Sequence, residues 1–230
     1  MKKMFGLLIV FIALVSTSAY SASGGVAFTF FFPDKGEFGE PLSLSLNNIG
    51  FNLVGEYVGI NTGISLYNIN GMGIKGLPFE LSQPGMGPFL SLKVPLVLKL
   101  SVPISIVTLE ANGGGFAFYN FGMRLTRAFD YTMQSYLNYA ALSTDLKFNN
   151  GIGFGWMAGG AINVKVQEKL TVGVSCHYLN GGLPLNLTGT YTGGPSGGTV
   201  TSTTLNTNTY KNAYLDYTGL EFSLGVSYEI

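Results

Sequence analysis

The chain contains one histidine, His177, and one cysteine, Cys176, so few of its side chains could serve catalysis or metal binding. An imidazole is the usual general base in enzymes, which makes His177 the first residue to consider. No set of histidines, cysteines and carboxylates with metal-ligand spacing accompanies it. The Gly-rich turns also lack the Lys and the helix start of a phosphate-binding loop. The sequence therefore predicts no enzymatic activity, no metal site and no cofactor.

Charged side chains recur instead at alternate positions of stretches that are otherwise apolar. In residues 219–230 the even positions are all apolar, whereas the odd positions carry Glu221, Glu229, two hydroxyls and two glycines. A period of two indicates a β-strand with one apolar and one polar face. If the strands close into a barrel, the same parity gives a polar network that faces the lumen: Lys93, Lys99, Arg124, Asn163, Lys165, His177 and Glu221. In a narrow barrel we expect these groups to pair with one another rather than to line a pore or a ligand site.

The amino terminus has the features of a secretory signal peptide. Lys2 and Lys3 precede an apolar run at 5–15, and a small-residue stretch follows at 16–23. The apolar run is shorter than the roughly 20 residues that a membrane anchor, the alternative interpretation, would need. We predict a signal peptide at 1–22 and one domain at 23–230.

The composition of the exported part limits its partners. Without Lys2 and Lys3, ten basic residues remain against twelve acidic ones, with no basic cluster, which argues against a nucleic-acid partner. Mean hydropathy is +0.33, yet no later window approaches 18 consecutive apolar residues. High hydropathy spread over alternate positions is typical of a membrane barrel.

Alternation occurs in eight stretches, and the connections between them are long and short in turn. The predicted strands cover about 25–32, 42–53, 60–67, 90–106, 116–126, 154–166, 170–178 and 219–230. Long outer loops, short periplasmic turns and an even strand number are typical of outer-membrane barrels. The predicted fold is all-β, an antiparallel up-and-down transmembrane β-barrel of eight strands. The alternative, an exported lipocalin-like or sandwich domain, would bury the apolar faces in a core.

Two strand assignments leave alternatives open. Residues 90–106 contain no turn signal, which favours one long strand, although Pro95 and Pro103 leave a two-strand interpretation. A barrel of ten strands is the alternative if Leu183–Thr192 joins the wall.

The connections carry further predictions. The Asn112–Gly115 run predicts a tight turn. Residues 128–142 do not alternate and predict a short helix within one loop. Gly181–Asn212 is low in charge and rich in Thr, Ser, Gly and Asn, which predicts a long mobile loop.

This pattern resembles the small outer-membrane β-barrel proteins of Gram-negative-type bacteria, the class of eight-stranded barrels such as OmpA and OmpX. The resemblance covers the mature chain and is architectural. It implies a bacterial outer-membrane location, with outer-membrane lipid and the barrel-assembly machinery as partners. That machinery reads the carboxy-terminal strand, which usually ends in Phe or Trp, whereas this chain ends in Ile230 with Tyr228 two places before.

Residues 177–182 also resemble the His-Tyr-Ser-Asn motif of the outer-membrane lipid A deacylases, which are small barrels too. The Ser supplies the nucleophile in that family. Here the position holds Leu179, which cannot attack an ester. A lipid A-modifying enzyme is therefore the weakest functional hypothesis.

Ring positions and loops complete the prediction. Trp156, Tyr178 and Tyr228 fall at strand ends, where aromatic rings mark the membrane interfaces.

The predicted function is a structural or surface-interaction role for an integral outer-membrane barrel. The alternative is a narrow, porin-like transporter or binder of a small hydrophobic molecule, with 128–142 as a lid or plug.

Overall fold

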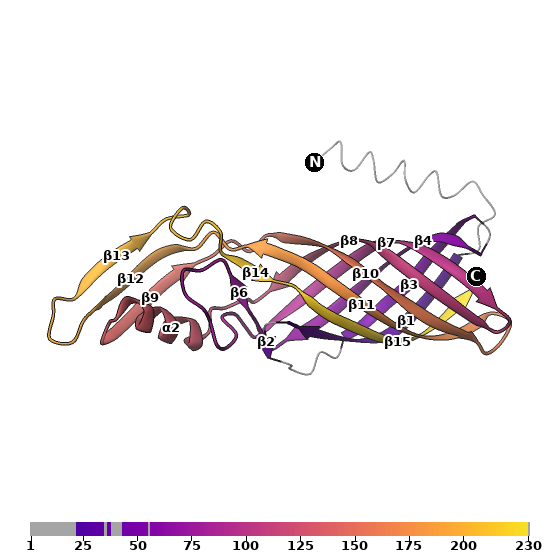
Figure 1. Cartoon of the computed structure of the whole chain (residues 1–230), viewed down its shortest axis with the longest axis horizontal. Helices are drawn as coiled ribbons and strands as arrows, with labels where there is room; N and C mark the ends of the chain where they lie inside the picture. The colour runs from indigo at the N-terminus through magenta and orange to yellow at the C-terminus, as the bar shows by residue number, and fades with distance from the viewer. Residues whose placement is uncertain (1–21, 35, 38–42, 55, 230) are drawn as a thin grey trace.

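The computed structural model describes residues 22–34, 36–37, 43–54 and 56–229, so residues 1–21 of the predicted signal peptide lie outside the described part. Within it, eight strands form one antiparallel sheet that closes on itself through pairing of β10 with β11 (Figure 1). The barrel strands are β1 (Ala22–Pro33), β3 (Ser43–Val54), β4 (Val58–Ile69), β7 (Phe89–Ile104), β8 (Val107–Phe121), β10 (Ile152–Lys165), β11 (Leu170–Pro184) and β15 (Gly219–Glu229).

The predicted eight-stranded, up-and-down barrel is confirmed. Each strand pairs with its neighbours in the chain, and β1 pairs with β15 along Ser23 to Pro33. Closure leaves no barrel strand with a free edge among the described residues, so every strand of the wall has two partners. The ten-strand alternative is wrong, because residues 188–194 pair in a separate sheet outside the wall.

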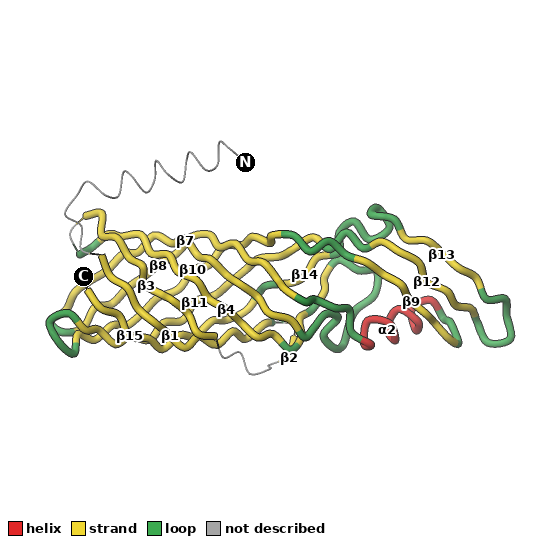
Figure 2. Tube along the Cα trace, turned by 180° about the vertical axis from the view of Figure 1, so that it is seen from behind, coloured by secondary structure: helices red, strands yellow, loops and turns green. Residues whose placement is uncertain are grey.

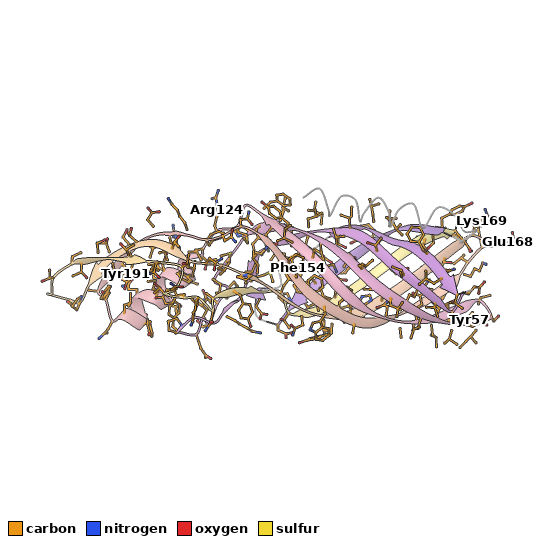
Figure 3. The ribbon with its side chains drawn as sticks, turned by 90° about the horizontal axis from the view of Figure 1, so that it is seen from above. Tyr57, Arg124, Phe154, Glu168, Lys169 and Tyr191 are labelled. Carbon is orange, nitrogen blue, oxygen red and sulfur yellow. The ribbon has the colours of Figure 1, made fainter. Side chains whose placement is uncertain are left out.

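The connections follow the predicted alternation. Short turns join β3 to β4, β7 to β8 and β10 to β11 at one end of the barrel, and β15 ends beside them, where the Glu229 amide donates to the Lys169 carbonyl. Figure 3 places Tyr57, Glu168 and Lys169 together at this end. The long connections all emerge from the opposite end.

Strand β7 is one element of sixteen residues, so the two-strand alternative is wrong. Its prolines lie where pairing with β4 lapses. The β4 ladder passes from Thr62 opposite Leu96 directly to Ser65 opposite Lys93, and Pro95 falls in that gap. The missing proline donor therefore leaves no ladder bond unmade there.

The predicted turn at Asn112–Gly115 is also wrong. The β7–β8 turn is Ser105–Ile106, where Ser105 has a φ of 58°, and residues 112–115 lie inside β8. A Cβ on Gly114 would lie 2.2 Å from the Leu96 carbonyl oxygen. Gly114 therefore allows close approach of β7 to β8 and does not mark a reversal of the chain.

A folded cap, residues 122–151 and 185–213, extends beyond the barrel end that carries the long connections (Figure 2). Its sheet has the order β13 (Thr201–Leu205), β12 (Thr188–Gly194) and β9 (Ala141–Lys147). Helix α2 (Arg127–Leu137) packs near β9 and buries Phe129 and Met133. The predicted short helix is confirmed. The predicted mobile loop at 181–212 is wrong, because half of that segment is paired strand, in the end of β11 and in β12 and β13.

Residues between barrel and cap form short ladders. The pairs are β2 (Gly36–Glu37) with β5 (Gly71–Met72), and β14 (Tyr214–Asp216) with both β6 (Ile74–Lys75) and the end of β11.

Helix α2 begins at the N-cap Thr126, whose hydroxyl accepts from the Phe129 amide, and ends at Asn138 with a φ of 57°. No helix of the described chain is long and apolar enough to cross a membrane.

Candidate functional site in the barrel lumen

Strand parity decides which side chains enter the lumen. Along β7 the even positions from Val94 to Ile104 are 42–58% exposed on the outer wall, whereas Lys93 is buried inside. Along β11 and β15 the same rule turns His177 and Glu221 inward. Charged side chains of barrel strands that are distant in the chain therefore meet in the lumen.

A buried ion-pair cluster crosses the lumen. The Lys93 ammonium and the Tyr67 hydroxyl both donate to Oε2 of Glu221. His177 Nδ1 lies 3.9 Å from Oε1 of the same carboxylate. Tyr67, Lys93 and Glu221 are each at most 4% exposed. Glu221 thus joins β4, β7, β11 and β15, and loss of one partner would leave a buried charge unpaired.

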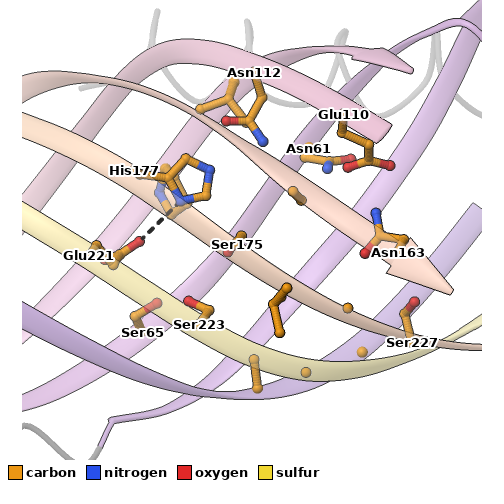
Figure 4. A pocket seen from close by; sticks show the side chains of 18 of the residues that line it. Asn61, Ser65, Glu110, Asn112, Asn163, Ser175, His177, Glu221, Ser223 and Ser227 are labelled. Carbon is orange, nitrogen blue, oxygen red and sulfur yellow. Dashed lines mark ion pairs between the residues drawn. The ribbon is translucent and has the colours of Figure 1, made fainter. Parts of the chain in front are cut away.

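On the short-turn side of this cluster the lumen holds a polar chamber of about 90 Å³ (Figure 4). Its lining includes Asn61, Asn112, Asn163, Ser175 and Ser223. A second pair sits in its wall, with Lys99 Nζ 3.5 Å from Glu110 Oε1. Oδ1 of Asn61, Oδ1 of Asn112 and His177 Nδ1 have no protein hydrogen-bond partner. Water can satisfy such atoms in a polar space of this size.

On the cap side of the cluster an aromatic plug, Phe31, Phe116, Phe118 and Tyr217, fills the lumen. Tyr217 stacks on Phe31 at 4.8 Å and on Phe118 at 4.3 Å between ring centroids. Tyr217 lies in the short link between β14 and β15. Its backbone amide donates to the Gly181 carbonyl. The contacting rings therefore fill this half of the lumen mainly with aromatic surface.

The predicted lumen residues separate into three groups. Lys93, His177 and Glu221 form the central cluster, and Lys99 and Asn163 border the chamber. Lys165 lies at the end of β10 and is exposed at the short-turn rim. The placement of Arg124 in the lumen is wrong, because β8 ends at Phe121 and Arg124 is exposed outside the barrel (Figure 3).

Several lumen residues were missed by sequence reasoning. Tyr67 shares the parity of Asn61 and Ser65 on the polar face of β4, and that parity could have identified it. Glu110 and Asn112 were missed because the turn was placed inside β8. Tyr217 lies outside any alternating stretch, so no sequence signal pointed to it.

The predicted interface aromatics lie on the outer wall. Trp156 and Tyr228 are each 51% exposed and Tyr178 is 38% exposed. The Trp156 and Tyr178 rings pack 5.8 Å apart near the cap side, while Lys169 Nζ lies 5.9 Å from the Tyr228 ring at the short-turn side. The two positions mark opposite ends of the barrel wall.

The residues that resemble the deacylase motif do not assemble a nucleophile. Leu179 is fully buried in the lumen on the same side of β11 as His177, whereas Asn180 is exposed on the outer wall. In the described ranges no group of three or more His, Cys, Asp and Glu side chains is arranged to hold a metal ion.

No family model and no curated protein matches the sequence. Among solved structures, a major outer membrane protein from Thermus thermophilus aligns with a TM-score of 0.50 at 11% identity, over 93% of this chain and 100% of that one. The outer membrane protein OprG from Pseudomonas aeruginosa aligns at 0.44 and 12% identity, over 92% and 93% of the two chains. The outer membrane protein AlkL in lipid bilayers aligns at 0.41 and 12% identity, over 94% and 93%. Because the Thermus alignment spans nearly the whole of both chains, this protein has the fold of a small outer-membrane β-barrel.

Proposed function

We propose that the protein is an integral β-barrel of the bacterial outer membrane that acts through its folded cap, in a structural or surface-interaction role without enzymatic activity. The supporting observation is the contrast between the two ends of the molecule. The lumen is closed by the aromatic plug and the Glu221 cluster, while residues 122–151 and 185–213 are built into a sheet and a helix outside the barrel. A sealed lumen favours a barrel that presents a surface over one that conducts.

The outer wall supports the membrane part of this proposal. The lipid-facing residues of β7 and β15 form continuous apolar stripes that would be exposed to water in a soluble protein. The barrel strands contain 11 to 16 residues, and about 9–11 suffice to cross a bilayer. Outer-membrane lipid is then the first partner.

The route to the membrane extends the proposal. Residues 1–22 act as the cleaved signal peptide, and β15 is the element that the barrel-assembly machinery reads. Its apolar outer face ends at Tyr228, which lies beside the short turns. Deletion of residues 2–22 should leave the barrel in the cytoplasm, and cell fractionation measures this directly.

Planar-bilayer recording tests the functional assignment. We expect no stable conductance of a single size from the wild-type protein, together with a membrane fraction whose gel mobility changes on boiling. Stable unitary conductance would instead favour the alternative of a narrow transporter for small apolar molecules. Partition into the soluble fraction without heat-modifiable mobility would contradict the barrel assignment in the cell.

A catalytic role can be tested separately. His177→Ala should leave the acylation of lipid A in the producing cell unchanged, because the neighbouring Leu179 offers no nucleophile. Mass spectrometry of extracted lipid A makes this comparison. A change in acyl-chain number that depends on His177 would contradict the proposal.

A further inference from the structure

A groove of about 540 Å³ lies on the outer wall where the barrel meets the cap. We call it the outer-wall groove and define it by Phe154, Trp156, Asn180, Gly182, Lys211 and Tyr214. These residues belong to β10, to β11 and to the segment that enters β14. The groove is therefore on the lipid-facing side of the barrel and separate from the lumen.

The groove results from a local break in the wall. Strand β11 pairs with β15 as far as Leu179 opposite Gly219, and then with the three-residue β14 from Gly182 onward. Gly182 presents no side chain outward, and a Cβ there would lie 2.9 Å from Cδ2 of Tyr214. The 211–214 segment can therefore lie close against the wall, which deepens the groove beneath it.

The two ends of the groove differ in polarity. Towards the barrel it is bordered by Phe154, 66% exposed, and Trp156, 51% exposed. Towards the cap it is bordered by Tyr214 and two lysines, Lys75 and Lys211, whereas Asn180 pairs with Trp156 at the barrel end. A groove with exposed aromatic rings at one end and phenol and ammonium groups at the other matches the order of acyl chain and headgroup in a lipid leaflet.

The charge of the groove rests on Lys211. Lys75 Nζ is engaged at 2.7 Å by Oδ2 of the buried Asp216, so these two charges compensate each other. Lys211 is exposed and forms no ion pair with the residues that the structure describes. The groove therefore offers one uncompensated ammonium beside hydrogen-bonding groups, which suits a phosphate.

We propose that the outer-wall groove binds the phosphate-bearing headgroup of a membrane lipid, with Lys211 at the phosphate and Phe154 and Trp156 along the acyl chain. This inference rests on the proposed membrane location. It names one class of lipid that the barrel selects from its surroundings. The contacts involve no covalent step, so the lipid exchanges with the bulk leaflet.

Trp156 is the only tryptophan of the chain and lies in the groove, so its fluorescence reports occupancy directly. The full-length mature barrel is reconstituted in phosphatidylcholine vesicles that contain a minor fraction of lipid with brominated acyl chains. The brominated lipid is phosphatidic acid in one series and phosphatidylcholine in the other. One ammonium near a membrane surface favours an anionic lipid by about fivefold in relative association constant, and we expect that preference from quenching of Trp156.

Lys211→Ala should reduce the preference to near unity, and added salt should weaken it in the wild type. Lys169→Ala is the matched control, because Lys169 is also an exposed lysine but lies at the short-turn end. This control should keep the full preference. Heat-modifiable gel mobility confirms that each variant has folded.

The outcomes distinguish the lipid inference from the membrane proposal. Equal quenching by both brominated lipids, or an equal loss of preference in the two lysine variants, would overturn lipid selection at the groove while leaving the membrane location intact. Failure of both brominated lipids to quench Trp156 would instead overturn the membrane location of the barrel wall.

Discussion

The two halves of the lumen are built by the same eight strands but are filled in opposite ways. The cap-side half contains the stacked rings of Phe31, Phe118 and Tyr217. The short-turn half contains amides, hydroxyls and the Lys99–Glu110 pair around a chamber of about 90 Å³. The Glu221 cluster separates them. Closure of a barrel therefore does not by itself make the interior polar. The residue types that point inward decide whether each part of the lumen is polar or apolar.

This difference has a consequence for tolerance to substitution. In the plug every ring contacts other rings, so a lost or added atom changes packing. In the chamber, space is available, so side chains can rotate and water can enter. The two halves should therefore respond differently to similar changes.

The largest effect is expected at the boundary between the halves. Glu221→Ala leaves the buried Lys93 ammonium without its partner and should lower the free energy of unfolding by about 3–5 kcal/mol. The double variant Lys93→Met, Glu221→Leu removes both charges and should recover most of that loss. Urea-induced unfolding in lipid vesicles measures both. A double variant as unstable as the single one would show that the pair itself stabilises the barrel.

Removal of the plug ring should be the next largest change. Tyr217→Ala vacates the space between Phe31 and Phe118 and should cost about 3 kcal/mol. It should also join the chamber to the cap side, which planar-bilayer recording would detect as a new conductance. Ser223→Ala, a small change on the chamber side, is the control and should produce no conductance. A closed Tyr217→Ala barrel would show that the Glu221 cluster seals the lumen alone.

Two glycine substitutions compare the halves directly. A Cβ on Gly153 would lie 2.2 Å from the Phe118 ring, which Tyr217 holds in place, so Gly153→Ala should cost about 1–3 kcal/mol. A Cβ on Gly173 would lie 1.9 Å from Asn163 Oδ1, an amide that can rotate into the chamber. Gly173→Ala should therefore stay within about 0.5 kcal/mol. Equal costs in urea unfolding would contradict the contrast between a packed and a hydrated half.

The smallest effect concerns the Lys75–Asp216 ion pair at the cap end of the barrel, which is compared with the Lys93–Glu221 pair inside the lumen. The hydrogen bond to Asp216 raises the pKa of Lys75 above its ordinary value of 10.5. A raised pKa in the folded state stabilises the fold fully below the unfolded pKa, and that contribution is lost as pH rises through the folded value. Because Lys75 is 34% exposed, the loss should stay below about 1 kcal/mol. Unfolding midpoints between pH 9 and 12 should fall in the wild type, and this component should be missing in Lys75→Met.

The sequence predicted much of the lumen but not its contacts. Parity alone turned Glu221 inward toward a basic residue, and the structure identifies that residue as Lys93. Parity failed at Arg124, because a strand was extended past Phe121 to a point where Gly122 adopts a φ of 73° and the chain leaves the wall. Alternation persists for several residues beyond a strand end by chance, so it cannot locate the end.

Turn chemistry failed for a related reason. Asn112–Gly115 has the composition of a turn, yet close approach to β7 requires glycine at Gly114. The actual turn uses Ser105 in the left-handed region, a residue type that gives little signal. Composition reports that a glycine is tolerated, and only the neighbouring strand shows why.

The sequence by itself determined the period of two, the strand number, the order of long and short connections and the short helix of the cap. These are local properties, set by alternation and by residues that stop a strand. Only the tertiary structure decided which strands' side chains meet across the lumen, that Tyr217 plugs it, and that residues 188–205 form part of the cap. Those contacts join residues far apart in the chain, and they depend on the register and closure of the whole barrel, to which each strand contributes only a part.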